Sequence, residues 1–94
     1  MTRNPDAIRS TEKSSSWFGP CEICARHCSE VHKRTVGAHP GRIPDLVFGH
    51  ARCLAKPGDL RAVAKAFRRA YHTVGLEGHE LQQYMADKQA ELCR

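Results

Sequence analysis

Two pairs of metal-binding residue types constrain this chain more than any other feature. Cys21 and Cys24 lie three positions apart in the stretch GPCEIC, and His50 and Cys53 have the same spacing in HARC. Side chains three positions apart on a turn face the same side, so each pair can reach one ion. Together they predict a tetrahedral Cys3His site whose four positions are all filled by the protein. Such a closed set suits one structural Zn²⁺ ion and leaves no position for a catalytic water.

Other thiol chemistries remain open from these residues. Cys28 could complete a four-thiolate set with Cys21, Cys24 and Cys53 for an iron–sulfur cluster, or it could replace His50 as the fourth zinc ligand. A redox pair would need a βαβ context, which this chain lacks. A disulfide framework is disfavoured by the odd count of five cysteines. His27 and His32 are alternative ligands, although solvent-facing or supporting positions are favoured for both.

The stretch from C-x2-C through a hairpin-like segment to FGHARCL resembles the single-zinc fingers of the treble-clef kind. These include half of a LIM module and the H-x2-C-Leu end of PHD-type fingers. The resemblance covers about residues 19–56 and is confined to the motif. It implies that a knuckle supplies the first two ligands, that a β-hairpin follows, and that the last two ligands lie at the start of a helix. LIM and PHD modules hold a second zinc site, whereas this chain has no second set of four ligands, so no particular family function is implied.

Size and pattern predict a small α+β domain stabilised by zinc. At 94 residues with one Trp, two Tyr and three Phe, the chain can bury only a thin core, so a metal would add needed stability. Polar residues 1–16 predict a disordered tail. Residues 17–56 predict the zinc-binding finger, in which Trp17 plugs the core and residues 29–49 form a hairpin. Residues 57–94 predict a helical hairpin of two α-helices packed on the finger.

The two expected helices have amphipathic patterns. Asp59 is a predicted N-cap for the first, and the second runs from about residue 77 or 79 to Leu92. Apolar residues recur at helical spacing in both, so each helix should bury one face. The apolar positions are Leu60, Val63, Ala64, Phe67, Ala70, Tyr71 and Val74 in the first helix and Leu81, Tyr84, Met85 and Leu92 in the second.

Positive charge is concentrated in the middle of the chain. The formal net charge is +5, and residues 26–72 hold ten Lys or Arg against three acids, whereas residues 73–94 hold four acids against two bases. This asymmetry favours a polyanionic partner, so the first hypothesis is a small nucleic-acid-binding regulatory module; a merely solvated basic surface is the alternative. The predicted contact residues are Arg61, Lys65, Arg68 and Arg69 on one helix face, with Arg52, Lys56, Lys33, Arg34 and Arg42 extending it.

The second hypothesis is a protein-interaction adaptor, such as a phage- or plasmid-type regulator, which could be a homodimer. Its contact would be the last helix or the Trp17–Phe18 anchor. An enzyme is disfavoured because the chain lacks an H-E-x-x-H motif, a Gly-rich phosphate loop and a deaminase set. The one enzyme considered is a nuclease with His32 or His39 as the base. Since no membrane-length apolar run or secretory signal is present, we expect a cytoplasmic protein with no membrane partner and no small-molecule substrate.

Overall fold

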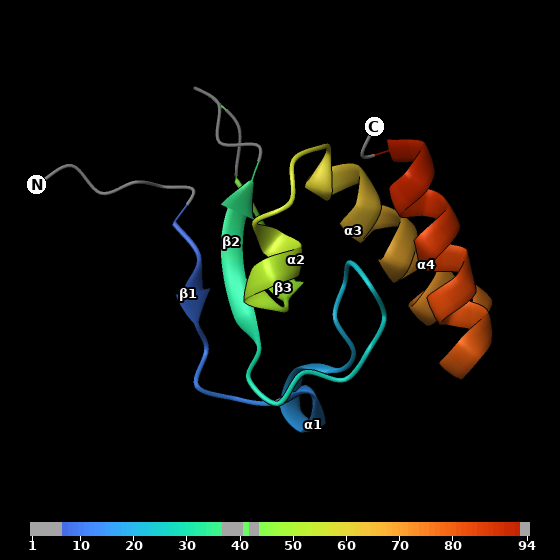
Figure 1. The fold of residues 1–94 in the computed structure, drawn as a ribbon, viewed down its shortest axis with the longest axis horizontal. Coiled ribbons are helices and arrows are strands. Elements are labelled where there is room, and N and C mark those ends of the chain that lie inside the picture. Colours follow the sequence, from blue (N-terminus) through green and yellow to red (C-terminus); the bar gives the residue numbers. More distant parts are fainter. Residues whose placement is uncertain (1–6, 37–40, 42–43, 93–94) are drawn as a thin grey trace, which may run out of the picture.

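The computed structural model describes residues 7–36, 41 and 44–92, which form a three-stranded sheet beside a pair of packed helices (Figure 1). Residues 1–6 of the expected tail, residues 37–40, 42 and 43, which include His39, and residues 93 and 94 lie outside the described residues. Among the helices described, none combines the length and the apolar character needed to cross a membrane. The elements are β1 (Arg9–Ser10), α1 (Ser15–Phe18), β2 (His32–Val36), β3 (Asp45–Gly49), α2 (Ala51–Leu54), α3 (Leu60–Arg68), η1 (Arg69–Val74) and α4 (Gly78–Leu92).

The sheet is antiparallel with the strand order β1-β2-β3. The predicted hairpin is confirmed: β2 and β3 pair from His32 opposite Gly49 to Val36 opposite Asp45. β3 therefore ends directly before His50, and α2 begins directly after it. The hairpin thus delivers the second predicted ligand pair to one end of the sheet.

Residues 9–16 correct the expectation of a disordered tail that extends to residue 16. β1 pairs with β2, and the backbone N–H of Thr11 donates to the carbonyl of Val31 at 2.9 Å. The hydroxyl of Ser15 accepts a hydrogen bond from the N–H of Cys28 at 2.8 Å. A polar, serine-rich segment can be ordered when its hydroxyls and backbone groups pair with distant parts of the chain. Composition alone does not reveal those partners.

Trp17 corrects a second expectation, because it lies on the surface and does not plug the core. Its side chain on α1 is 74% exposed, and the neighbouring Phe18 is 40% exposed. The amino group of Lys13 lies 5.4 Å from the centroid of the Trp17 ring, and Phe18 stacks on Phe48 at a centroid distance of 5.1 Å. The core beside the following turn is instead filled by smaller side chains such as Ile23.

α3 follows its predicted pattern and then changes geometry. The Asp59 carboxylate caps it as predicted, and Ala70 is the last buried residue of the apolar stripe. In η1 the chain is π-helical, and this segment closes at Gly75, whose φ of 86° lies in the left-handed region. A π-helix bonds residues five apart, so the register set by 3.6 residues per turn shifts along η1. Tyr71 still packs against the core, but the end of η1 leaves the apolar stripe. Val74, expected in the core, is consequently 64% exposed.

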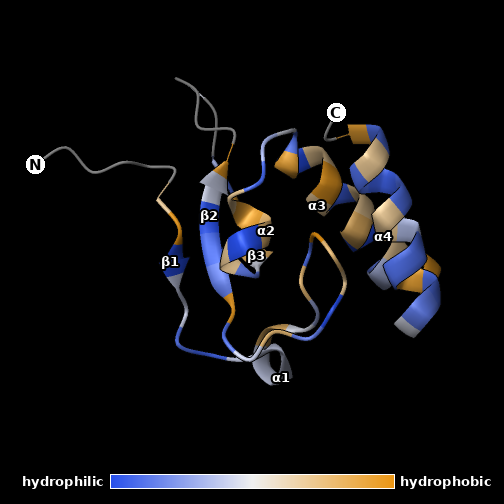
Figure 2. Cartoon of the chain, viewed as in Figure 1, coloured by the Kyte–Doolittle hydropathy of each residue, from blue (hydrophilic) through white to orange (hydrophobic). Residues whose placement is uncertain are grey.

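One hydrophobic core joins the sheet, the turn that carries Cys21 and Cys24, and the helices. α3 contacts both β3 and α4, so it is the central layer between the sheet and the last helix (Figure 1). Figure 2 shows that β2 is largely hydrophilic, whereas hydrophobic residues recur along α3 and α4. The apolar face of α4 is therefore buried against the rest of the molecule. Among the most deeply buried residues are Ile23, Leu54, Val63, Leu81 and Met85.

Candidate metal centre

The four predicted ligands meet at one point of the fold. The ligand atoms of Cys21, Cys24, His50 and Cys53 all lie within 4.8 Å of one another. The first two come from the knuckle, the turn formed by residues 20–26, in which the N–H of Ala25 donates to the carbonyl of Cys21 at 2.9 Å. His50 lies between β3 and α2, and Cys53 is buried within α2. This group could hold a metal ion.

The spacing of the donor atoms suits four-coordination. The Nδ1 atom of His50 lies 3.3 Å from the sulfur of Cys24 and 3.8 Å from the sulfur of Cys53. In a tetrahedral zinc site with ordinary bond lengths, a sulfur and a nitrogen ligand are about 3.5 Å apart. The two observed distances bracket that value, so an ion could be bound without a large rearrangement.

The ring of His50 is oriented by a backbone contact on its far side. Its Nε2 atom lies 3.1 Å from the carbonyl oxygen of His27. Since a carbonyl oxygen can only accept, Nε2 carries the proton in this contact, and the lone pair of the neutral ring is left on Nδ1, facing the sulfurs. His27 therefore supports the cluster through its backbone, and its imidazole is not among the clustered ligand atoms.

Hydrogen bonds and neighbouring thiols set the charge of the cluster. The sulfur of Cys21 accepts the backbone N–H groups of Ile23 at 3.4 Å and His50 at 3.5 Å. Donation from the thiol of Cys24, followed by that of Cys53, lowers the pKa of Cys21, and the contact with Cys21 raises the pKa of both partners. Without a cation the cluster thus favours one thiolate held by two protonated thiols. Three thiolates so close together need a positive ion between them.

Gly49 is a functional position that the sequence analysis missed. A Cβ atom at this residue would lie 2.5 Å from the sulfur of Cys21, closer than real Cβ atoms approach other atoms. The absence of a side chain lets the end of β3 lie against the knuckle, which brings the N–H of His50 to the same sulfur. The feature of the sequence that could have indicated this close approach is the glycine directly before the histidine in FGHARC.

We expect Gly49→Ala to lower metal affinity by about 10-fold, because the added methyl group displaces the Cys21 sulfur from its hydrogen bonds. Competition with a chromophoric chelator would measure the change. Gly78→Ala is the matched control: its φ of 58° makes an alanine strained there, yet its Cβ would have no atom within 4 Å. If both variants lower the affinity equally, the loss reflects general strain and the close approach at Gly49 is unimportant.

Cys28 and His32, the other candidate ligands, are not part of the cluster. Cys28 is fully buried, and burial raises the pKa of its thiol to about 11, so it remains protonated. Its sulfur lies 3.9 Å from the carbonyl of Arg26. The ring of His32 lies 3.7 Å from the carboxylate of Glu30. The geometry therefore favours the Cys3His set over the four-thiolate alternative.

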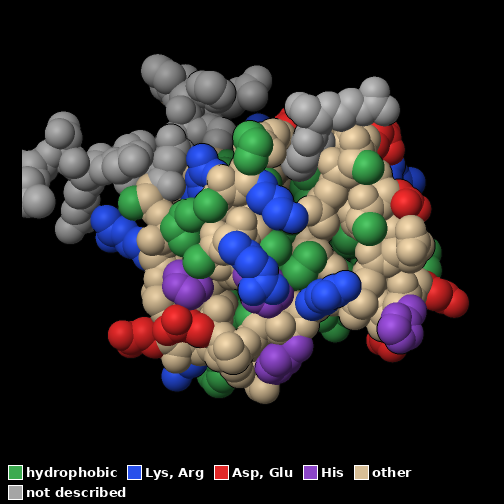
Figure 3. Space-filling model, in the orientation of Figure 1, with side chains coloured by type: hydrophobic (Ala, Val, Ile, Leu, Met, Phe, Trp, Pro, Cys, Tyr) green, Lys and Arg blue, Asp and Glu red, His purple; other side chains and the backbone are tan. Residues whose placement is uncertain are grey.

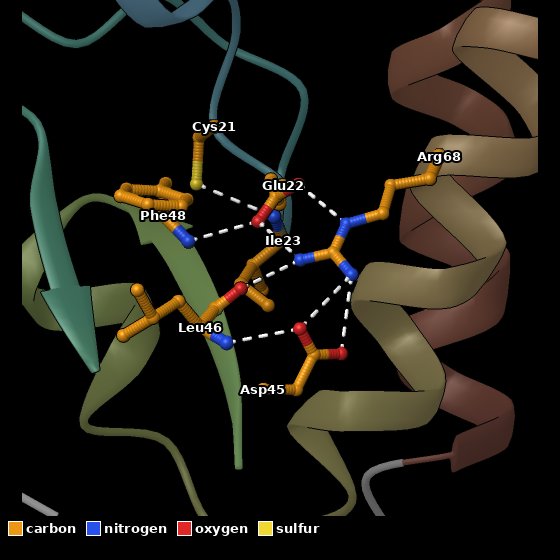
Figure 4. A network of polar contacts seen from close by, with 7 residues as sticks. All are labelled: Cys21, Glu22, Ile23, Asp45, Leu46, Phe48 and Arg68. Atoms are coloured by element: carbon orange, nitrogen blue, oxygen red, sulfur yellow. Dashed lines mark hydrogen bonds and ion pairs between the residues drawn. The ribbon is translucent and has the colours of Figure 1, made fainter. Parts of the chain in front are cut away.

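A polar network joins the knuckle to α3 (Figure 4). The guanidinium of Arg68 forms two hydrogen bonds with the carboxylate of Glu22, at 2.9 and 3.2 Å, and an ion pair with Asp45 at 3.2 Å. It also donates to the carbonyl of Leu46 at 2.6 Å, and Glu22 in turn accepts the N–H of Phe48 at 2.9 Å. Because Glu22 lies between the two knuckle cysteines, this network fixes α3 against both the candidate metal centre and β3.

The network also changes the predicted nucleic-acid surface. Arg68 was expected to contact phosphate, but its charge is satisfied by two carboxylates within the protein. Arg34 likewise donates to the carbonyl of Leu54 at 2.6 Å, and Arg61 is half-buried. Arg42 lies outside the described residues. The exposed members of the predicted set are Arg52, Lys56, Lys65 and Arg69.

Charged side chains are unevenly distributed over the surface. Figure 3 shows Lys and Arg side chains gathered in the middle of one face, while Asp and Glu lie toward its edges, including the side formed by α4. The charge asymmetry along the sequence thus becomes a spatial one.

No protein-family model, curated protein or solved structure matches this chain. The structure contains the hairpin of β2 and β3 and then α2, which begins after His50, in the order that the motif resemblance implies. The four clustered ligands are the other part of the resemblance that the structure contains.

Proposed function

We propose that this protein binds one structural Zn²⁺ ion in a finger of the treble-clef kind. The observation that carries this proposal is the convergence of four ligand atoms within 4.8 Å, with Nδ1 of His50 directed at the sulfurs. Three sulfurs and one imidazole nitrogen form a donor set typical of structural zinc. When bound, the ion would offset most of the negative charge of the three thiolates and cross-link the knuckle to α2. A set closed by protein ligands offers no site for substrate or water, which supports a role other than catalysis.

Elemental analysis of protein purified without added metal tests this proposal. We expect one zinc per chain and no visible colour. Iron and sulfide, with absorbance in the visible range, would contradict it and would bring back the four-thiolate cluster with Cys28.

We further propose that the protein is a regulatory module that binds nucleic acid through its basic surface. The supporting observation is that Arg52, Lys65 and Arg69 are exposed and form no ion pair with a described carboxylate. These side chains can neutralise backbone phosphates, which releases counterions.

Binding to a DNA or RNA oligonucleotide should therefore weaken steeply with salt. Two phosphate contacts would make it roughly tenfold weaker between 50 and 200 mM salt, and further contacts would steepen the slope. Fluorescence anisotropy at several salt concentrations measures this. Binding that is absent at low salt, or that is indifferent to salt, would contradict the proposal.

A protein-interaction adaptor is the second candidate, and one specific observation favours it. Trp17, Phe18 and Leu46 are 74%, 40% and 41% exposed. The alternative contact through the last helix is disfavoured, because Leu81 and Met85 are buried in the core. Pull-down of a partner by the native protein, with Trp17→Ser as the comparison, would support this candidate if the serine variant folds and loses the partner.

A further inference from the structure

A groove of about 260 Å³ lies directly against the candidate metal centre. Its lining includes Cys24 and Cys53, two of the four clustered ligands, and Gln82 on α4. The groove is therefore placed where the knuckle, α2 and the last helix come together. Neither the amphipathic pattern nor the ligand spacing predicted it, because its lining comes from three separated parts of the sequence.

Three cationic side chains line this groove: Arg26 from the knuckle, Arg52 from α2 and Lys56 just after α2. Its described lining contains no carboxylate. Arg26 and Arg52 are exposed, and neither forms an ion pair with a described residue. The amino group of Lys56 donates to the amide oxygen of Gln89 at 3.1 Å, a neutral partner that leaves the lysine charge uncompensated.

The metal centre alone does not balance this positive charge. A zinc ion held by three thiolates and a neutral imidazole would carry one net negative charge, whereas three side-chain cations line the groove. The positive charge that remains is left in the groove. By contrast, the charge of Arg68 on α3 is compensated by ion pairs with Glu22 and Asp45 inside the protein.

From these observations we infer that the groove between the knuckle, α2 and α4 binds a phosphate group. Guanidinium groups pair with phosphate oxygens through two parallel N–H donors, and the lysine adds a point charge. The volume is below the range typical of sites for drug-sized ligands, about 300–1,000 Å³, so a single phosphate or diphosphate fits better than a larger molecule. The source is either a nucleic-acid backbone, in which case the inference rests on the proposed nucleic-acid function, or a free phosphate compound.

The test uses the full-length, zinc-loaded protein and two probes, inorganic pyrophosphate and a short oligonucleotide, at low salt. Arg26→Gln and Arg52→Gln each remove one charge without altering a metal ligand, and Arg9→Gln on β1 removes one charge outside the groove. Each groove variant should weaken binding about five- to tenfold, whereas Arg9→Gln should change it less than twofold. Zinc content and the melting temperature are measured for every variant, and Arg26→Lys replaces Arg26→Gln if the latter loses zinc.

The outcomes separate the groove from the proposed function. Weaker binding of both probes by the groove variants supports a phosphate site that nucleic acid can use. Pyrophosphate binding without oligonucleotide binding supports the groove and overturns the nucleic-acid function. Oligonucleotide binding that depends on Lys65 and Arg69 but not on Arg26 and Arg52 contradicts the phosphate site in the groove and supports the nucleic-acid function. Binding of neither probe overturns both.

Discussion

Replacing Cys53 with serine, or removing the metal with a strong chelator, is expected to unfold this protein. Structural zinc contributes about 10–16 kcal/mol in small zinc domains, which equals or exceeds the total stability of about 5–15 kcal/mol that is usual for a folded domain. Cys53 is buried, and its sulfur is one of the atoms that join α2 to the knuckle. Without the ion, the crowded thiols supply no comparable cross-link.

Far-ultraviolet circular dichroism and thermal melting would measure this loss, which should be reversed by zinc after chelation. Cys28→Ala is the matched control, since Cys28 is equally buried but lies outside the ligand cluster. It should keep one zinc per chain and cost only about 1–2 kcal/mol, because a small side chain is truncated. An apoprotein that melts at the same temperature as the zinc form would refute the structural role, and zinc loss in Cys28→Ala would point to a different ligand set.

The second large effect is expected for Arg68→Ala, which should reduce the free energy of unfolding by about 2–3 kcal/mol. Truncating one partner of a buried ion pair usually costs about 3–5 kcal/mol, and we lower that value because the Arg68 side chain is itself 33% exposed. The Glu22 side chain is only 12% exposed and would keep its negative charge with the N–H of Phe48 as its remaining partner. Urea unfolding of the zinc-loaded protein measures the change.

Two further variants make this prediction specific. Arg68→Lys keeps the charge but cannot contact Glu22, Asp45 and the Leu46 carbonyl at once, so it should recover about half of the loss. Lys65→Ala removes a charge from the exposed face of the same helix and should change stability by less than about 0.5 kcal/mol. If Lys65→Ala is as damaging as Arg68→Ala, the network does not fasten α3 to the knuckle.

The best sequence predictions concern features with a local cause. The hairpin was predicted from a polar segment with β-branched residues, from Gly and Pro breakers and from a short apolar run. The N-cap at Asp59 was predicted from a residue type whose side chain reaches its own helix. The predictions for Trp17 and Val74 failed because burial depends on packing against distant segments. A large apolar residue is not buried when smaller side chains already fill the adjacent core, and a helical stripe ends where the helix becomes π-helical.

By itself, the sequence determined the two candidate ligand pairs, because a short spacing places Cys21 beside Cys24 and His50 beside Cys53. It left Cys28 as an alternative fourth ligand, and the tertiary structure brings His50, not Cys28, to the cluster. Only the tertiary structure decided which charges are free. Arg68 and Arg52 look equivalent in the sequence, yet one is paired with Glu22 and Asp45 while the other lines an open groove. The physical reason is that a charge is neutralised by whichever groups the fold brings within a few ångströms, and those partners lie 46 and 23 positions away from Arg68 in the chain.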